Sequence, residues 1–545
     1  MEDPEDANHG EVFTKPWVVN LILDLAGYVP DVDLGSRVAI EPACGSGAFL
    51  VPMVRRLSSS CRFIGRDLAS TSDAIYATDV QIANVQASKA AVQAALVEEG
   101  WSEKVGGLLA DSWIHHDDFL LGQDLTDSAD YVLGNPPYVR LEDVPTERRA
   151  AYQRACPTMG GRADLYVGFF EIGLRALRDN GRLAFICADR WMRNSYGRHL
   201  RSLVASDFAV ETIVTMHDVD AFEEPVAAYP AVTVLSRKRQ EGVIRADTNV
   251  SFGAKDAQVL GSWVARRRST TKTTRAFSAA ELPSWFSGEA SWPDGSPGQL
   301  LLLADLEARF PSIEETGAQV GIGIATGADS IFVTTDSELV EDDRLQPLAM
   351  VRDTTSGHYE WSGHYLVNPW GLDRGLVDLD QFPKMRDYFA ESAELIRRRH
   401  IARKRPQHWY RTIDGFNPSL VAKPKLLLPD MKVTMAPVLE PGGHYPHHNL
   451  YYVISDSWPL ETLGGLLLSR VAEFFIRSYA VKMRGGTLRF QAQYLRRIRV
   501  PALESLCDST RIELGNAFEE RDVEKATGLA LRAYGLDPGA EELFV

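Results

Sequence analysis

An amide, two prolines and a phenol follow one another after an apolar, strand-like run in the stretch ADYVLGNPPYVRLEDV, residues 129–144. The side-chain oxygen of Asn135 and the carbonyl oxygen of Pro136 can both accept hydrogen bonds. Because proline fixes its own φ and holds the preceding residue extended, Pro136 and Pro137 lock these acceptors in place and add no N–H donor. The ring of Tyr138 can stack on a flat ligand. The stretch therefore presents two fixed hydrogen-bond acceptors and an aromatic ring where a strand opens into a loop, and a rigid loop without chemistry is the alternative.

A glycine-rich stretch, EPACGSGAFL at residues 41–50, is the second informative motif. Gly45 and Gly47 have no side chains, so the chain can turn sharply there and a ligand can approach the backbone. The helix expected next offers its N-terminal amides. The motif lacks the third glycine of a dinucleotide fingerprint and the Gly-Lys-Ser/Thr of a phosphate loop. Nicotinamide cofactors and ATP are therefore disfavoured.

An acid at the end of the following strand is suited to bind the two hydroxyls of a ribose. We favour Asp79 in YATDVQ, because the long helical pattern after it fits a βα unit. Asp67 in IGRDL lies closer to the usual spacing and is the rival candidate. A third interpretation is that Asp79 only caps the following helix.

Short apolar strands alternate with helical patterns through the first 240 residues. The patterns predict strands at 36–43, 74–80, 129–137 and 182–188, and helices at 47–57, 81–100 and 164–181, the last of which is expected to end at Gly181. Strands that are separated by helices pair in parallel. The sequence therefore predicts an α/β fold with a Rossmann-like, doubly wound sheet.

The pattern changes after residue 245. Residues 246–298 are rich in Ser, Thr, Pro and Gly, and we interpret them as a connecting segment. Residues 299–545 mix strands and helices without βα alternation, which predicts a mixed α+β domain. A chain of 545 residues is long enough for two or three domains, and we expect them at 1–245 and 299–545.

The composition is that of a globular protein, with 45% hydrophobic and 24% charged residues. The acidic start MEDPEDANHG is unlike a secretory signal peptide, and no apolar run reaches the roughly 18 residues that span a bilayer. The five cysteines are scattered and lack metal-ligand spacing. These features predict a cytoplasmic protein with free thiols, no membrane association and no metal.

The two motifs together resemble the cofactor and catalytic motifs of S-adenosylmethionine-dependent DNA adenine-N6 methyltransferases of restriction-modification systems. Upstream, GEVFTKPWVVNLIL at residues 10–23 resembles the N-terminal cofactor element of that family, although Lys15 separates Thr14 from the proline. The order of the motifs, with a large domain after them, is that of the gamma arrangement. Residues 321–333 and 483–501 more loosely resemble parts of a target-recognition domain. The resemblance implies a class I methyltransferase domain followed by a target-recognition domain.

The resemblance implies methyl transfer to N6 of an adenine in double-stranded DNA. The lone pair of N6 is delocalised into the ring, so acceptors for its two hydrogens draw the nitrogen toward tetrahedral geometry. Asn135 and the carbonyl of Pro136 are expected to take this part, with Pro137 holding the loop. Tyr138 is expected to stack on the base once it has swung out of the helix, with Phe222 on its other face. Tyr229 is the alternative to Phe222.

The resemblance also implies a set of cofactor-binding residues. They are Thr14, Glu41, Pro42, Ala43, Gly45, Gly47, Asp79, Asp118 and Phe119. Asp118 and Phe119, in HDDFL, are expected to contact the adenine of S-adenosylmethionine. An ordinary turn or cap role is the alternative for Asp118.

The net charge of −16 argues against a nucleic-acid partner, but binding depends on how positive charge clusters on one face. Residues 265–275, 396–411 and 482–499 are basic and contain no Asp or Glu. The expected DNA-binding residues are Arg403, Arg405, Arg484 and Arg489. The glycines at 485 and 486 favour close approach to a duplex. Ion pairing within the domain is the alternative for these arginines.

Two other classes of protein share parts of this pattern. Enzymes that methylate a glutamine amide in protein release factors also contain Asn-Pro-Pro-Tyr, but they are shorter and have little beyond the catalytic domain. A non-catalytic DNA-binding subunit would keep the fold, but here both motifs are intact. The sequence shows no nuclease constellation. Cleavage of DNA is therefore expected only from a separate cognate restriction endonuclease or defence protein.

Overall fold

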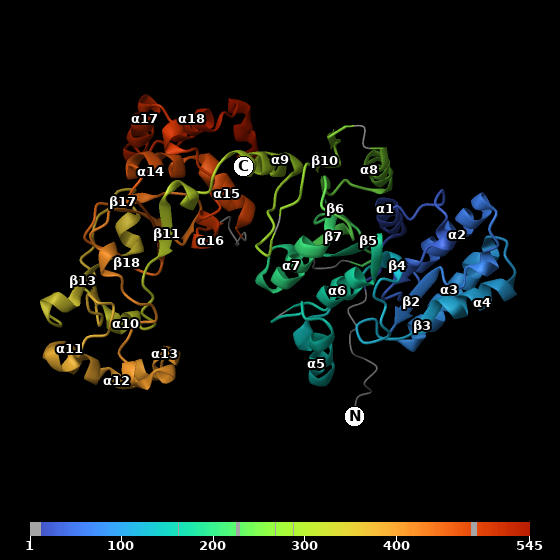
Figure 1. Ribbon diagram of the computed structural model, residues 1–545, viewed down its shortest axis with the longest axis horizontal. Coiled ribbons are helices and arrows are strands. Elements are labelled where there is room, and N and C mark those ends of the chain that lie inside the picture. Colours follow the sequence, from blue (N-terminus) through green and yellow to red (C-terminus); the bar gives the residue numbers. More distant parts are fainter. Residues whose placement is uncertain are drawn as a thin grey trace. The chain divides into compact units, whose positions relative to one another are not determined.

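The computed structural model describes residues 12–161, 163–224, 229–266, 269–286, 288–480 and 488–544. Backbone contacts divide the chain into two compact units, Met1–Leu301 and Leu302–Val545 (Figure 1). Among the described residues, no helix is both long and apolar enough to cross a membrane.

A 10-stranded sheet forms the centre of the first unit. Its strands are β1 (Ala39–Glu41), β2 (Ile75–Asp79), β3 (Ile114–His116), β4 (Ala129–Gly134), β5 (Leu177–Ala188), β6 (Ala209–Thr215), β7 (Pro230–Ser236), β8 (Val243–Thr248), β9 (Thr271–Thr273) and β10 (Phe277–Leu282). They lie in the order β3-β2-β1-β4-β5-β7-β6-β8-β10-β9. The strands from β3 to β5 pair in parallel, whereas β7 is antiparallel to both of its neighbours.

Helices alternate with the strands of this sheet. They are α1 (Pro16–Ala26), α2 (Leu50–Ile64), α3 (Ile82–Glu98), α4 (Glu103–Trp113), α5 (Thr146–Ala155), α6 (Tyr166–Ala176), α7 (Arg198–Asp207) and α8 (Ala254–Arg266). α1 packs against α2 and α8, α2 packs against α3, and α6 packs against α7. The apolar residues of β1, β2 and β4 are buried between these helices. The expected α/β, Rossmann-like fold is confirmed.

Two stretches differ from the sequence-based expectation. Residues 246–298, expected as a connection, contain the end of β8, all of α8 and the strands β9 and β10, and these strands extend the sheet. Thr is β-branched and is common in strands as well as in loops, so a Thr-rich segment does not distinguish a connection from a strand. The prediction that the helix ends at Gly181 is wrong, because α6 ends at Ala176 and Gly181 lies within β5. A Cβ at Gly181 would lie 2.9 Å from the carbonyl oxygen of Ala129, so a close backbone approach explains this glycine.

The second unit combines small sheets with helices, which confirms the expected mixed α+β fold. Its strands are β11 (Ala318–Ile322), β12 (Val333–Thr334), β13 (Leu345–Ala349), β14 (Tyr365–Val367), β15 (Lys425–Pro429), β16 (Met431–Lys432), β17 (Val438–Glu440), β18 (Tyr445–Pro446), β19 (Leu450–Ser455) and β20 (Leu488–Arg489). They form two 4-stranded sheets, β11-β19-β15-β17 and β12-β14-β13-β18, and the pair β16-β20.

The helices of the second unit lie before, between and after its strands. α9 (Pro297–Arg309) begins before residue 302, and the others are α10 (Asp329–Phe332), α11 (Pro383–Glu391), α12 (Ala393–Arg398), α13 (His400–Lys404), α14 (Leu460–Leu468), α15 (Arg470–Tyr479), α16 (Ala492–Leu495), α17 (Asp508–Glu519) and α18 (Val523–Tyr534). A core that includes Phe332, Phe389 and Ile396 joins α10, α11 and α12.

The order of the strands determines where a ligand can enter the first unit. β1 lies between β2 and β4, and the chain proceeds outward from β1 to β2 and β3 before it returns to β4. In open parallel sheets, ligands bind at the carboxyl ends of the strands where the order reverses in this way. The glycine-rich loop follows β1 and the Asn-Pro-Pro-Tyr loop follows β4. The fold thus places the two motifs side by side at this point.

Candidate functional site

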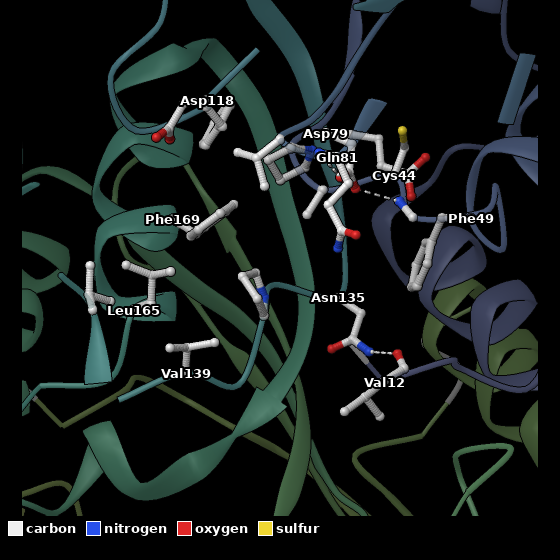
Figure 2. Close-up of a pocket in the computed structure, with 18 of the residues that line it drawn as sticks. Val12, Cys44, Phe49, Asp79, Gln81, Asp118, Asn135, Val139, Leu165 and Phe169 are labelled. Atoms are coloured by element: carbon white, nitrogen blue, oxygen red, sulfur yellow. Dashed lines mark hydrogen bonds between the residues drawn. The ribbon is translucent and has the colours of Figure 1, made fainter. Parts of the chain in front are cut away.

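A cavity of about 440 Å³ lies at the carboxyl ends of β1, β2 and β4 (Figure 2). Its volume is within the range of sites for small ligands, roughly 300–1,000 Å³. The following residues that were expected from the sequence line it: Thr14, Glu41, Pro42, Ala43, Gly45, Asp79, Asp118, Phe119, Asn135 and Pro137. The tertiary structure therefore brings most of the expected set to one place.

The glycine-rich loop is held by the strand and helix beside it. Gly45 and Gly47 have φ angles of 50° and 97°, values that side chains disfavour. The N–H of Gly45 donates to Oδ2 of Asp79 at 2.9 Å, and the carbonyl of Gly45 accepts from Oγ of Ser88 at 2.7 Å. Gly47 lines a neighbouring groove instead of the main cavity. The loop is thus fixed from both sides.

Asp79 lines the cavity and also bonds to backbone groups. Its Oδ1 accepts from the N–H of Gln81 at 2.8 Å, just before α3. A carboxylate has about four lone-pair sites, so it can make these bonds and still accept from a ligand. Asp67 caps a short helical turn by accepting from the N–H of Ala69 at 3.0 Å, and it is not among the residues that line the cavity. The geometry favours Asp79 over Asp67.

The amide of Asn135 is fixed by the N-terminal segment. Its Nδ2 donates to the carbonyl oxygen of Val12 at 2.8 Å and to Oγ1 of Thr14 at 3.1 Å (Figure 2 shows the bond to Val12). Because a carbonyl oxygen can only accept, the NH₂ group must face Val12. The Oδ1 atom of Asn135 is buried and has no hydrogen-bond partner among the described residues. The side chain therefore presents a free acceptor.

The two aromatic residues that were expected to stack on the base contact each other. The rings of Tyr138 and Phe222 have centroids 6.2 Å apart and meet edge to face at 82°. Tyr138, Phe222 and Pro136 do not line the main cavity. Tyr229, the alternative to Phe222, is 55% exposed and packs on His217. The structure thus pairs Tyr138 with Phe222.

A short antiparallel contact brings the N-terminal segment to this pair. The N–H of Lys15 donates to the carbonyl of Ala221 at 3.0 Å, and the N–H of Glu223 donates to the carbonyl of Phe13 at 2.9 Å. Thr14 and Phe222 form a β-bridge between these bonds. One segment therefore contacts both Asn135 and the residue that carries the second aromatic ring.

Glu41 contributes a buried carboxyl group to the cavity. It is 1% exposed, and its Oε2 has no hydrogen-bond partner in the part of the chain that the structure describes. Burial raises the pKa of Glu41 well above its ordinary value of 4.5, and the charge of Asp79 raises it further. A buried carboxyl group without a partner at a cavity is suited to a donor or cation of a ligand.

Asp118 is bound by two residues that the sequence reasoning missed. Its Oδ2 accepts from Nη2 of Arg148 at 2.7 Å and from the hydroxyl of Tyr152 at 2.8 Å. Both donors come from α5 and line the cavity, and next to them Phe119 stacks on Phe169 at 5.5 Å. Residues four apart share one face of a helix, so the spacing of Arg148 and Tyr152 was a signal. Nothing in the sequence, however, indicated that this face meets Asp118.

The four expected DNA-binding arginines have different environments. Arg403 and Arg405 are exposed on α13 and directly after it, whereas Arg489 forms an ion pair with Asp430 that raises the pKa of Arg489. Arg484 lies outside the described residues. In the basic segment 396–411, which also contains Arg403 and Arg405, Arg399 donates to the carbonyl of Thr326 at 2.7 Å and therefore supports the fold.

In the described part of the second unit, three possible metal ligands lie close together. They are Asp329, His447 and His448. Nε2 of His447 lies 3.1 Å from Oδ2 of Asp329, and Oδ1 of Asp329 accepts from the hydroxyl of Thr326. A hydrogen bond accounts for the contact between His447 and Asp329, and the absence of a metal remains a prediction.

Comparisons with known proteins agree along almost the whole chain. Residues 76–222 match the Eco57I restriction-modification methylase family. The chain is 43% identical to the Type II methyltransferase M.PaeR7I of Pseudomonas aeruginosa over 531 residues, which cover 97% of this chain and 92% of that protein. It is 38% identical to M.XhoI of Xanthomonas vasicola, over 98% of each chain. A solved structure of the Type IIL restriction-modification enzyme MmeI in complex with DNA aligns with a TM-score of 0.48 and 12% identity, over 97% of this chain and 77% of that one. Identity of this level to two Type II methyltransferases, over nearly their full lengths, shows that the protein belongs to the Type II DNA methyltransferases of restriction-modification systems.

Proposed function

We propose that the protein transfers a methyl group from S-adenosylmethionine to N6 of an adenine swung out of double-stranded DNA. Its family makes DNA the substrate, in place of the glutamine amide of a protein. The observation that carries the choice of chemistry is the free, buried Oδ1 of Asn135, whose amide is turned by Val12 and Thr14. The choice of adenine over cytosine rests on the resemblance of the two motifs to adenine-N6 enzymes.

The cavity suits S-adenosylmethionine in size and charge. This cofactor supplies a methyl group that is activated by its sulfonium, and it also carries an ammonium group and an adenosine. The buried carboxyl of Glu41 and the carboxylate of Asp79 offer partners for cationic and hydroxyl groups. Figure 2 shows Asp118 and Phe169 on one side of the cavity and Cys44 and Phe49 on the other. An adenine ring fits the side with Asp118, where Phe119 and Phe169 supply aromatic surface.

At the reacting nitrogen, the protein acts by accepting hydrogen bonds. Oδ1 of Asn135 and the carbonyl of Pro136 accept hydrogen bonds from the two N–H groups of N6, which turns the nitrogen lone pair toward the methyl group. The free Oδ1 is already in place, so its orientation requires no rearrangement when the base enters. The rings of Tyr138 and Phe222 stand edge to face. One of them must turn before a base can stack between them.

We further assign target recognition to the second unit, which gives the gamma arrangement of catalytic unit first. Arg403 and Arg405 are the best-placed candidates for phosphate contacts, because they are exposed. Arg484 and Arg489 remain candidates, and Arg489 would have to leave or share Asp430. DNA cleavage belongs to a separate cognate restriction endonuclease in this proposal.

The test is the chemical identity of the product. Purified protein is incubated with S-adenosylmethionine and duplex DNA of varied sequence, and the DNA is digested to nucleosides for mass spectrometry. We expect N6-methyladenine from the protein and none from Asn135→Ala prepared in the same way. N4-methylcytosine, or methylated protein with unmodified DNA, would contradict the proposal. Sequencing the modified bases in cells that express this chain alone gives the target site.

A further inference from the structure

We infer that Thr14 is a positioning residue for methyl transfer: the carbonyl of Val12 determines which end of the Asn135 amide it meets, and the hydroxyl of Thr14 holds the NH₂ group there, so that Oδ1 is left without a partner within the described part of the chain. This role differs from the cofactor contact that the sequence resemblance implies for Thr14. It rests on the proposed function, because the unpartnered Oδ1 matters only if it binds the amine that is methylated.

The hydrogen bonds of Asn135 leave only one useful orientation of the amide. A primary amide can turn by 180° about its last bond, which exchanges its oxygen and nitrogen. If Asn135 were turned, Oδ1 would face the carbonyl oxygen of Val12, and two acceptors would oppose each other. In the observed orientation, Nδ2 has an acceptor for each of its two hydrogens, at Val12 and Thr14. No N–H of Asn135 is then left to point at an incoming amine.

Thr14 is itself held firmly enough to serve as a reference point. It is 4% exposed, and backbone hydrogen bonds of Phe13 and Lys15 join this segment to residues 221–223. Thr14 forms a β-bridge with Phe222, so the same backbone segment carries the acceptor for Asn135 and borders the proposed stacking ring. Because the hydroxyl of Thr14 already holds the side chain of Asn135 in place, that side chain loses little conformational entropy when the base binds.

The two roles of Thr14 predict different kinetic signatures. Thr14 lines the cavity, so a cofactor contact is geometrically open to it. A residue that binds the cofactor changes the dissociation constant of the cofactor. A residue that orients Asn135 changes the rate of methyl transfer at saturating cofactor and leaves that dissociation constant alone.

The experiment compares Thr14→Val with Thr14→Ser. Valine keeps the branched shape and removes the hydroxyl, whereas serine keeps the hydroxyl. We expect Thr14→Val to slow single-turnover methyl transfer by roughly 2- to 13-fold, as for the loss of one neutral hydrogen bond. Thr14→Ser should stay close to the wild-type rate. Calorimetry with S-adenosylhomocysteine should give the wild-type dissociation constant for both variants.

A double-mutant cycle tests whether Thr14 acts through Asn135. In the Asn135→Ala background, Thr14→Val should cause no further loss of rate, because the amide that it orients is gone. If the two losses add, Thr14 does not act through Asn135 and the inference is overturned. Should Thr14→Val lower the melting temperature, Thr14→Ala and Thr14→Ser give the same comparison without an added methyl group.

The outcomes separate this inference from the proposed function. A wild-type rate for Thr14→Val, an equal loss in Thr14→Ser, or a weaker cofactor affinity with a normal saturated rate would each overturn the positioning role. A failure of the proposed function appears earlier, in the wild-type protein, as a product other than N6-methyladenine. The proposed function is therefore judged from the wild-type product alone, and the positioning role of Thr14 is judged from the variants.

Discussion

The cavity of the first unit and the basic segment 396–411 of the second unit use polar groups in opposite ways. In the cavity, Asn135 and Asp79 are fixed by backbone groups and still have acceptor capacity for a ligand. In the basic segment, Arg403 and Arg405 stand in solvent. A buried acceptor is strong because little water competes with it, whereas an exposed cation acts mainly through a field that salt screens. The first arrangement suits chemistry at one atom, and the second suits attraction to a long polymer.

The largest effect is expected at the buried acceptor. Asn135→Ala removes Oδ1, and donors or acceptors of this kind contribute about 2.7–4 kcal/mol in other active sites, or roughly 10²–10³ in rate. We expect single-turnover methyl transfer to fall by that factor while affinities for cofactor and DNA stay within about twofold. Rapid-quench kinetics and calorimetry measure the two quantities. A comparable loss of both affinities would indicate a disturbed fold and contradict the acceptor role.

The next effect is expected at the carboxylate beside the glycine-rich loop. Asp79→Ala removes a charged acceptor and frees the N–H of Gly45. Hydrogen bonds to charged groups contribute roughly 1.5–3 kcal/mol, so the dissociation constant of S-adenosylhomocysteine should rise roughly 10- to 150-fold. Asp67→Ala is the matched control, since Asp67 caps a helical turn outside the cavity lining. An unchanged constant for Asp79→Ala, with a raised one for Asp67→Ala, would transfer the ribose contact to Asp67.

A smaller effect is expected at the exposed cations of the second unit. If Arg403 and Arg405 each neutralise one phosphate, the double change to alanine should lower the slope of log affinity against log salt by about 0.9 per contact. Specific and nonspecific DNA should be affected alike, which fluorescence anisotropy at several salt concentrations can measure. Arg489→Ala should change the slope less, because Asp430 already neutralises Arg489. If the variant with both changes keeps the wild-type slope of log affinity against log salt, Arg403 and Arg405 do not contact DNA phosphates.

The smallest effect is expected from the proton on Glu41. Burial raises the pKa of Glu41 in the folded protein, so the folded state binds this proton more tightly than the unfolded chain. The contribution of Glu41 to the free energy of unfolding is then fully present below pH 4.5 and is lost as the pH rises through the folded pKa. Urea unfolding of the wild type and Glu41→Gln across this range should show the loss only in the wild type. Parallel curves would contradict a proton held by Glu41.

Local motifs were the part of the site that could be predicted. The loop with Gly45 follows a strand and precedes a helix, and Asn135 follows a strand, so short-range patterns were enough to place them near a sheet edge. The choice of Asp79 also came from a local pattern, the helix that follows it. The end of α6 at Ala176 was missed because a glycine after a helical pattern commonly ends the helix. Here Gly181 instead allows the backbone to approach Ala129 closely.

The sequence by itself determined the chemical groups available to this protein: an amide and a carbonyl in the Asn-Pro-Pro loop, a glycine-rich loop, and an acid at the end of the second strand. These depend on residues that are neighbours along the chain, whose conformations follow from local sterics. Only the tertiary structure decided which side of Asn135 faces the cavity, because Val12 and Thr14 lie more than 120 residues away in sequence. The order of the strands likewise brought Arg148 to Asp118, and folding paired Arg489 with Asp430. Such contacts depend on packing between distant segments, and no local pattern encodes it.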